Sequence, residues 1–149
     1  MTLPLHRPNT ELIAVAWLKT LPGVPSGSVG TTLPAAEAFA ADGFVQVVGV
    51  VGGSPDAYVP LRNPVVQVDT WAVNPGSKRP PWGKANTLIE NILAACFTTP
   101  DPIVLRDEYF AARLFEVAAT TEPRRIPGDE GGFARYSADL HFHWIQIEE

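Results

Sequence analysis

Apolar residues between Lys84 and Phe97 recur with the spacing of an α-helix. They are three or four positions apart, and mostly polar residues occupy the positions between them. A single apolar stripe is typical of a helix that packs on a core with one face. The pattern therefore predicts a surface helix over residues 84–97, whose buried stripe is Ala85, Leu88, Ile89, Ile92, Leu93 and Cys96.

Two segments alternate with the period of a β-strand, residues 63–73 and residues 133–147. Alternation of this kind predicts a strand with one face on the core and the other at least partly in water. The second segment is about three times the usual strand length of roughly five residues, so we expect it either to bend or to extend beyond the sheet. The core faces are Val66, Val68, Thr70 and Ala72 in the first segment and Tyr136, Ala138, Leu140, Phe142 and Trp144 in the second.

Further strands are predicted over residues 43–51 and 113–121, with a short strand at 29–33. Residues 35–41 form either a helical turn or a loop. In the strand at 43–51, one face is expected to carry Val45, Val47 and Val51 and the other Phe44, Val48 and Val50. In the strand at 113–121, Phe115, Val117 and Ala119 are expected on one side.

The first predicted helix is apolar on nearly all sides. Asn9 or Thr10 caps its start and it runs to about Thr20. A helix that covers a sheet needs only one apolar stripe, so the excess predicts that part of its surface meets another subunit. The interface candidates are Leu12, Ile13, Val15 and Trp17.

The order of elements is helix, strands, helix, strands. It predicts an α+β fold, with an antiparallel β-sheet and two main helices packed on one face. The chain of 149 residues is expected to form a single domain, residues 1–149. Residues 1–8 are expected to form an extended arm, and residues 74–83 and 122–132 proline-bearing loops.

Charge and composition limit the possible partners. Lys and Arg total 11 against 16 Asp and Glu, so the net charge is −5. An acidic chain is poorly suited to generic DNA or RNA binding, which requires a surplus of cations. The longest apolar run, Leu12–Leu18, is too short to span a membrane and does not resemble a signal peptide. The only cysteine, Cys96, cannot form an intrachain disulfide, which favours a reducing cytoplasm.

The strongest candidate for chemistry is Asp139-x-His141-x-His143, because period-two spacing places these side chains on one strand face. Two imidazoles at this spacing suit a zinc ion, but a catalytic zinc needs a third ligand, and the one other histidine is His6 in the arm. We favour a polar strand face instead, with no metal and no cofactor. A small metal-dependent enzyme built on these three residues stays as an alternative.

No sequence motif of a nucleophilic or nucleotide-binding enzyme is present, and Cys96 lies on an apolar stripe where a small hydrophobe is expected. The chain is therefore not expected to be an enzyme. Two basic pairs, Lys78–Arg79 and Arg124–Arg125, lie in the proline-bearing loops. These pairs, together with Arg135 on the polar strand face, are candidates for docking an acidic partner surface.

The segment Asn63–Ala72 and the helix that ends with Leu88–Leu93 resemble the tail terminator (tail completion, minor tail) proteins of long-tailed bacteriophages. In that family a Val-x-Val-Asp-x-Trp strand precedes a helix of the form Ala-x-x-Leu-x-x-x-Ile, as here. The closing strand Arg135–Trp144 also fits, as do the opening helix and the length.

The resemblance implies a homohexameric ring in the virion, at the head–tail junction. The ring caps the head-proximal end of the tail tube, stops its polymerisation and docks the head connector. Implied partners are a second copy of the chain, the tail tube protein and the connector or stopper, with DNA passing through the lumen without sequence-specific contacts. Assembly takes place in the host cytoplasm. The resemblance implies no catalytic residues. Other head–tail junction proteins, such as a stopper or adaptor, and a host-side ligand-binding module remain alternatives.

Overall fold

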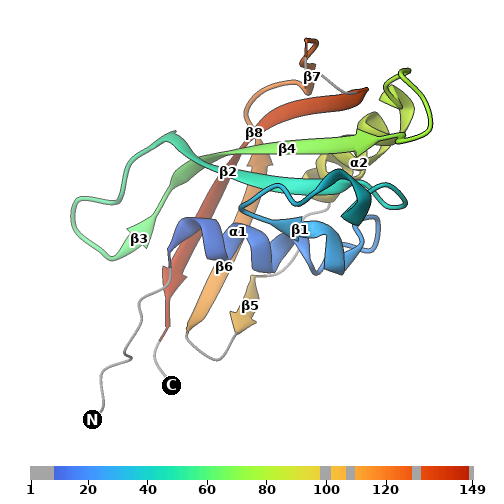
Figure 1. Ribbon diagram of the computed structural model, residues 1–149. Helices are drawn as coiled ribbons and strands as arrows, with labels where there is room; N and C mark the ends of the chain where they lie inside the picture. Colours follow the sequence, from blue (N-terminus) through green and yellow to red (C-terminus); the bar gives the residue numbers. More distant parts are fainter. Residues whose placement is uncertain (1–8, 98–101, 107–109, 129–131, 148–149) are drawn as a thin grey trace.

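A single curled β-sheet forms the framework of the computed structural model, and two α-helices pack against it (Figure 1). The structure describes residues 9–97, 102–106, 110–128 and 132–147, so the expected arm at residues 1–8 lies outside the described residues. The elements are α1 (Thr10–Leu18), η1 (Ser26–Ser28), β1 (Val29–Gly30), η2 (Ala36–Ala38), β2 (Phe44–Gly53), β3 (Leu61–Arg62), β4 (Pro64–Val73), α2 (Trp82–Phe97), β5 (Ile103–Arg106), β6 (Ala111–Ala119), β7 (Arg124–Arg125) and β8 (Phe133–Gln146).

The strand order is β1-β2-β4-β8-β6-β5, and β3 and β7 pair with the two ends of β8. All pairs are antiparallel except the short parallel contact of β1 with β2. Each half of β8 has strand partners on both sides, from β4 and β7 near its start to β3 and β6 near its end. The long last strand is therefore the centre of the curled sheet, and it does not project towards a partner.

The main core lies between the two helices and one face of the sheet. Val66 and Val68 of β4 and Leu140 of β8 are fully buried there, as the alternation of these segments predicts. The ring of Trp17 in α1 meets Phe142 of β8 edge-on at 5.5 Å between centroids. The α+β fold with both helices on one face is confirmed. The helix side chains in this core are Ile13, Ala14, Trp17 and Leu18 from α1 and Leu88, Ile89 and Ile92 from α2.

A smaller apolar cluster lies on the opposite face, beneath the segment that contains η2. Phe39 packs there against Phe44, with 6.1 Å between the ring centroids, and Trp71 meets Phe133 edge-on at 6.0 Å. The chain turns from this segment into β2 at Gly43, whose φ of 75° is in the left-handed region. The sequence patterns do not reveal this second cluster, because each aromatic comes from a different segment.

Three register shifts, two in β2 and one in β6, change the predicted strand faces. In β2 the register shifts at Val48 and again at Val51, so Val45 and Val47 are buried whereas Val51 is exposed. In β6 the register shifts at Phe115, and the buried residues are Leu114 and Val117. The predicted face of residues 43–51 is therefore wrong for Val51. In residues 113–121 Phe115 lies beside His143, whereas Val117 and Ala119 pack on the core as predicted, because one extra residue at the bulge reverses the alternation.

Several element boundaries also differ from the predictions. The helix α2 begins at Trp82, inside the expected loop 74–83, and the short strand β7 lies inside the expected loop 122–132. The strand β5 was not predicted at all, because its four residues are too few to show a clear alternation. Residues 129–131 of the second loop lie outside the described residues.

Candidate assembly surfaces

The helix α1 uses most of its apolar surface within its own chain. Asn9 caps it, since the amide of Leu12 donates to the Asn9 side-chain oxygen at 2.9 Å. Ile13 is fully buried and Trp17 is 6% exposed, because the curled sheet surrounds the helix with β1, β2, β4 and β5. Ile13 and Trp17 are therefore core residues, and the expectation that they lie at an interface with another subunit is wrong. Of the four interface candidates, Leu12 remains exposed and Val15 half-buried.

The two proline-bearing loops lie together at one end of the sheet, which the sequence leaves undecided. The guanidinium of Arg125 lies 3.9 Å from the ring centroid of Trp82, at the start of α2. A β-carbon on Gly132 would sit 3.1 Å from the carbonyl oxygen of Ser77, so the loops also touch there. The exposed basic residues of this end are Lys78, Arg79, Arg124 and Arg125, which we call the basic end.

An open hollow of about 520 Å³ lies between these two loops. Small-molecule pockets of similar size are lined mainly by apolar and aromatic side chains with a few convergent polar groups. This hollow lacks such a lining, and its one charged side chain is that of Lys78. The geometry favours contact with a protein surface over capture of a small ligand. The hollow is lined by Pro75, Gly76, Ser77, Lys78 and Gly132.

Arg135 is held inside the fold and does not belong to the basic end. Its Nη2 and Nε atoms lie 2.8 and 2.9 Å from Oδ2 of Asp69, whose side chain is completely buried. Its guanidinium also lies over the ring of Trp71, and Gln67 donates to the other Asp69 oxygen at 3.1 Å. These contacts give Arg135 a structural role within the fold, and we therefore leave it out of the basic end.

The Asp139, His141 and His143 side chains share one face of β8. A carboxylate oxygen of Asp139 lies 4.0 Å from Arg124, and the two imidazole rings stack with centroids 6.3 Å apart. Phe115 packs against His143 at 5.6 Å. Within the described residues, no three His, Cys, Asp or Glu side chains are grouped so as to hold a metal ion. His6 lies outside those residues, so the metal-enzyme alternative gains no support.

Burial raises the pKa of the Cys96 thiol to about 11 from its usual value of 9.0. The sulfur donates weakly to the carbonyl oxygen of Ile92 at 3.4 Å. Because the thiolate is the nucleophile, a raised pKa makes this cysteine unreactive. Its position on the apolar stripe of α2 is therefore that of a structural residue.

We expect Cys96 to react slowly with iodoacetamide in the folded protein at pH 8. The pKa difference of about two units predicts roughly 100-fold less thiolate than in the unfolded chain, and restricted access lowers the rate further. Mass spectrometry of labelled protein, with and without urea, measures the ratio. Equal labelling rates in the two conditions would show that the thiol is exposed.

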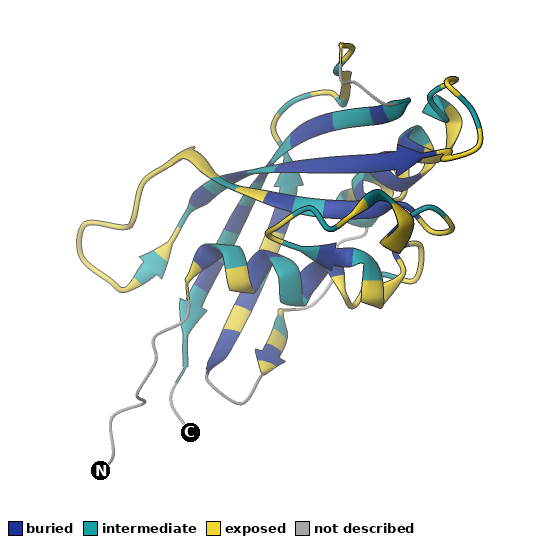
Figure 2. Cartoon of the chain, in the orientation of Figure 1, coloured by how far each residue is buried: buried dark blue, intermediate teal, exposed yellow. Residues whose placement is uncertain are grey.

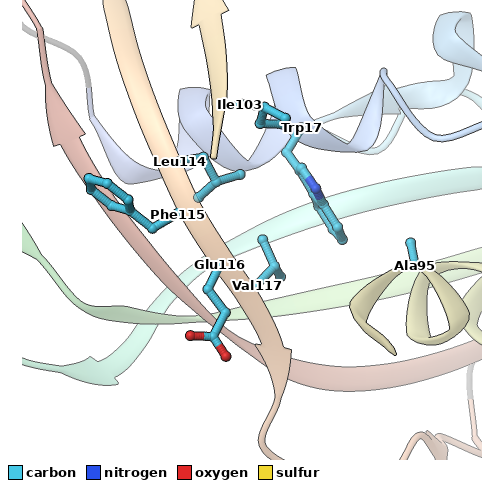
Figure 3. Close-up of a pocket in the computed structure, with 7 residues that line it drawn as sticks. All are labelled: Trp17, Ala95, Ile103, Leu114, Phe115, Glu116 and Val117. Carbon is cyan, nitrogen blue, oxygen red and sulfur yellow. The ribbon is translucent and has the colours of Figure 1, made fainter. Parts of the chain in front are cut away.

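A small cavity lies beside Trp17 at the junction of α1, α2, β5 and β6 (Figure 3). Its volume of about 20 Å³ is enough for one water molecule and far below that of a substrate pocket. The cavity indicates a local packing gap, not a site. Its lining is Trp17, Ala95, Ile103, Leu114, Phe115, Glu116 and Val117.

The sequence patterns do not predict one exposed apolar surface. The end of β2 and the loop to β3 project from the sheet, and every residue from 50 to 60 is exposed (Figure 2). This stretch is rich in apolar side chains, including Tyr58 and Val59. The sequence does contain an indication of this surface, because residues 43–60 include a single charged residue, Asp56.

No helix in the described part of the chain has the length and apolarity needed to cross a membrane. No protein-family model and no curated protein matches the chain. Among solved structures, the chain is similar to a chain of the virion of the native gene transfer agent (GTA) particle. The TM-score is 0.59 and the identity 10%, over 92% of this chain and 96% of that chain. At this identity the similarity shows a shared fold.

Proposed function

We propose that this chain is a structural protein of a phage-like virion, where it forms a ring that caps the head-proximal end of the tail tube. The observation that carries the proposal is the fold shared with a gene transfer agent virion chain over nearly the full length of both chains. The motif resemblance of Asn63–Ala72 and Arg135–Trp144 to tail terminators supports the specific position. In this role the protein ends tail polymerisation and docks the head connector.

The surface chemistry favours assembly over catalysis. The reactive candidates are a cysteine with a raised pKa and two stacked histidines without a grouped third ligand in the described residues. Exposed apolar side chains, by contrast, gather on β2 and on the loop that follows it. Such patches on a folded chain mark protein–protein contacts.

The capping role can be tested with particles that are assembled without this chain. Particles made without this chain should have tail tubes of uncontrolled length and unattached heads, because nothing ends polymerisation or offers the docking surface. Electron microscopy of lysates measures both features, and gold-labelled antibody should mark the head–tail junction of intact particles. Tails of normal length without the protein would contradict capping, and label elsewhere on the particle would indicate another virion position.

The basic end is the surface that we assign to the tube or the connector. Opposite charges steer such encounters, so a basic end on an acidic chain favours a partner with an acidic face. Lys78 and Arg79 are exposed to solvent in their loop, whereas the guanidinium of Arg125 stacks on the ring of Trp82. Lys78 and Arg79 are therefore the residues that can be changed with least effect on the fold.

Reversing both charges, in the variant Lys78→Glu/Arg79→Glu, is expected to slow docking about tenfold or more at low salt and to reduce its salt dependence. The mass of the free protein should not change. A control is Lys19→Glu, which reverses one exposed charge at the C-cap of α1 and is compared with the single variant Lys78→Glu. Docking rates measured on isolated tubes or heads should differ between the variants. Equal rates would remove the basic end from the contact.

A further inference from the structure

The large exposed hydrophobic side chains of the described residues fall into two groups on different parts of the sheet. The arm group surrounds the end of β2 and the loop that follows: Leu12, Val48, Val50, Val51, Tyr58 and Val59. The edge group consists of Phe97 at the end of α2 and Val104 in β5. Because β2 and β5 lie near opposite ends of the strand order, one copy presents two different apolar surfaces.

The segment that carries the arm group, from the end of β2 to β3, is fixed by local packing and hydrogen bonds. A β-carbon at Gly53 would collide with the carbonyl oxygen of Asn63, so the base of the arm is closely packed. At the tip, the Asp56 carboxylate accepts hydrogen bonds from the amides of Tyr58 and Val59 at 2.8 and 3.0 Å. The strand β3 then joins the sheet against β8. Tyr58, at 96% exposure, is therefore presented by a shaped loop.

The backbone of β2 is also open beside the arm group. The strand β1 pairs only with Val45 and Gln46, so the outer side of β2 from Val47 to Gly53 has no strand partner within the described residues. Natural proteins usually protect such an edge with charged side chains. Here the edge carries valines, which favours cover by another protein surface.

The two residues of the edge group come from the last residue of α2 and from β5. Ala95 and Ile103 line the same small cavity, which places the last turn of α2 beside the first residue of β5. Val104 is the residue after Ile103, so it points to the outer face of β5 and is 41% exposed. Phe97, the last residue of α2, is 77% exposed. The strand β5 is the last strand on this side of the sheet.

We propose that the arm group of one copy packs against the edge group of the next copy, as a head-to-tail contact that builds the ring. This inference rests on the proposed ring assembly and names its two surfaces. Two copies with a net charge of −5 repel each other, so their contact is favoured where charges are scarce, and residues 43–60 hold one charged side chain. Because the arm group and the edge group are different surfaces, a copy that contacts one neighbour through its arm group still has its edge group free for another. A series of such contacts can close into a ring.

The test uses single cysteines in a Cys96→Ala background and a short bismaleimide cross-linker. Tyr58→Cys and Val104→Cys are prepared separately, and both positions are exposed, so each variant should fold. We expect linked dimers when the two variants are mixed and almost none from either variant alone. Circular dichroism checks the fold of each variant, and light scattering gives its mass.

Each other outcome overturns the inference in a distinguishable way. Linkage of Tyr58→Cys to itself would indicate a two-fold contact through the arm. A multimeric mass without linkage in the mixture would leave the ring standing and remove these two surfaces from it. A monomer without linkage at every concentration would remove both the surfaces and the free ring.

A charge placed in the arm gives an independent readout. Tyr58→Asp is expected to weaken self-association at least tenfold without lowering thermal stability, because this side chain contacts solvent in the single copy. Thr31→Asp adds the same charge at an exposed position outside both groups and should associate normally. Equal association of the two variants would contradict the role of the arm.

Discussion

Replacement of Arg135 by methionine should lower the free energy of unfolding by about 3 kcal/mol. The reason is that Asp69 has no exposed surface, and its carboxylate loses the hydrogen bond from Nε at 2.9 Å and the ion pair with Nη2 at 2.8 Å. The remaining donor from Gln67 satisfies only one oxygen. Urea denaturation followed by tryptophan fluorescence measures the change.

Two controls separate this pair from ordinary surface charge. Arg124→Met removes a more exposed arginine whose nearest carboxylate oxygen is 4.0 Å away, and it should cost less than about 1 kcal/mol. The double variant Asp69→Leu/Arg135→Met removes both charges and should recover much of the lost stability. A small effect of Arg135→Met alone would show that the buried pair is unimportant and would return Arg135 to the docking candidates.

Trp17→Ala is the other substitution with a large expected effect, and it decides how α1 is used. Trp17 is almost completely buried against Phe142, so its loss should lower the free energy of unfolding by about 3–5 kcal/mol. The loss should not depend on protein concentration, because the contact lies within one chain. Thermal and urea unfolding at several concentrations measure both quantities.

Leu12→Ala is the matched substitution on the exposed side of the same helix. Its effect on the stability of the single copy should stay within about 0.5 kcal/mol, since Leu12 is 41% exposed. Its effect should appear instead as weaker self-association. A stable Trp17→Ala variant with altered mass would contradict the placement of Trp17 in the core.

The regular parts of the fold could be predicted because their patterns are local. Val66 and Val68 on β4 and Leu140 and Phe142 on β8 are buried on the helix side, as period-two alternation predicts. The stripe of α2 is also largely confirmed, with Leu88, Ile89 and Ile92 buried and Leu93 and Cys96 half-buried. These features depend on one strand or helix meeting one core.

The remaining features depend on partners distant in the sequence. The bulges at Val48 and Phe115 follow from the register with β4 and β8, which no local pattern contains. The Asp69–Arg135 pair joins residues 66 positions apart. A charged residue in an otherwise apolar strand is the signal that could have indicated a buried pair. The curl of the sheet around α1 also depends on residues far apart in the sequence. The local pattern of α1 therefore places Trp17 at an interface, although it lies in the core.

Assembly is the central property that we propose for this chain. The basic end and the two apolar groups each favour contacts with other protein surfaces. The proposed ring needs two different surfaces on each copy, and we assign these to the arm group and the edge group.

The most direct test is the absolute mass of the purified protein, measured by light scattering on a sizing column over a wide concentration range. The measurement is repeated with isolated tail tubes of the particle. Our prediction is one discrete species of roughly six protomers, free or on the tube ends, whose mass stops rising once the ring closes. A monomer at every concentration that also leaves the tubes unbound would contradict it.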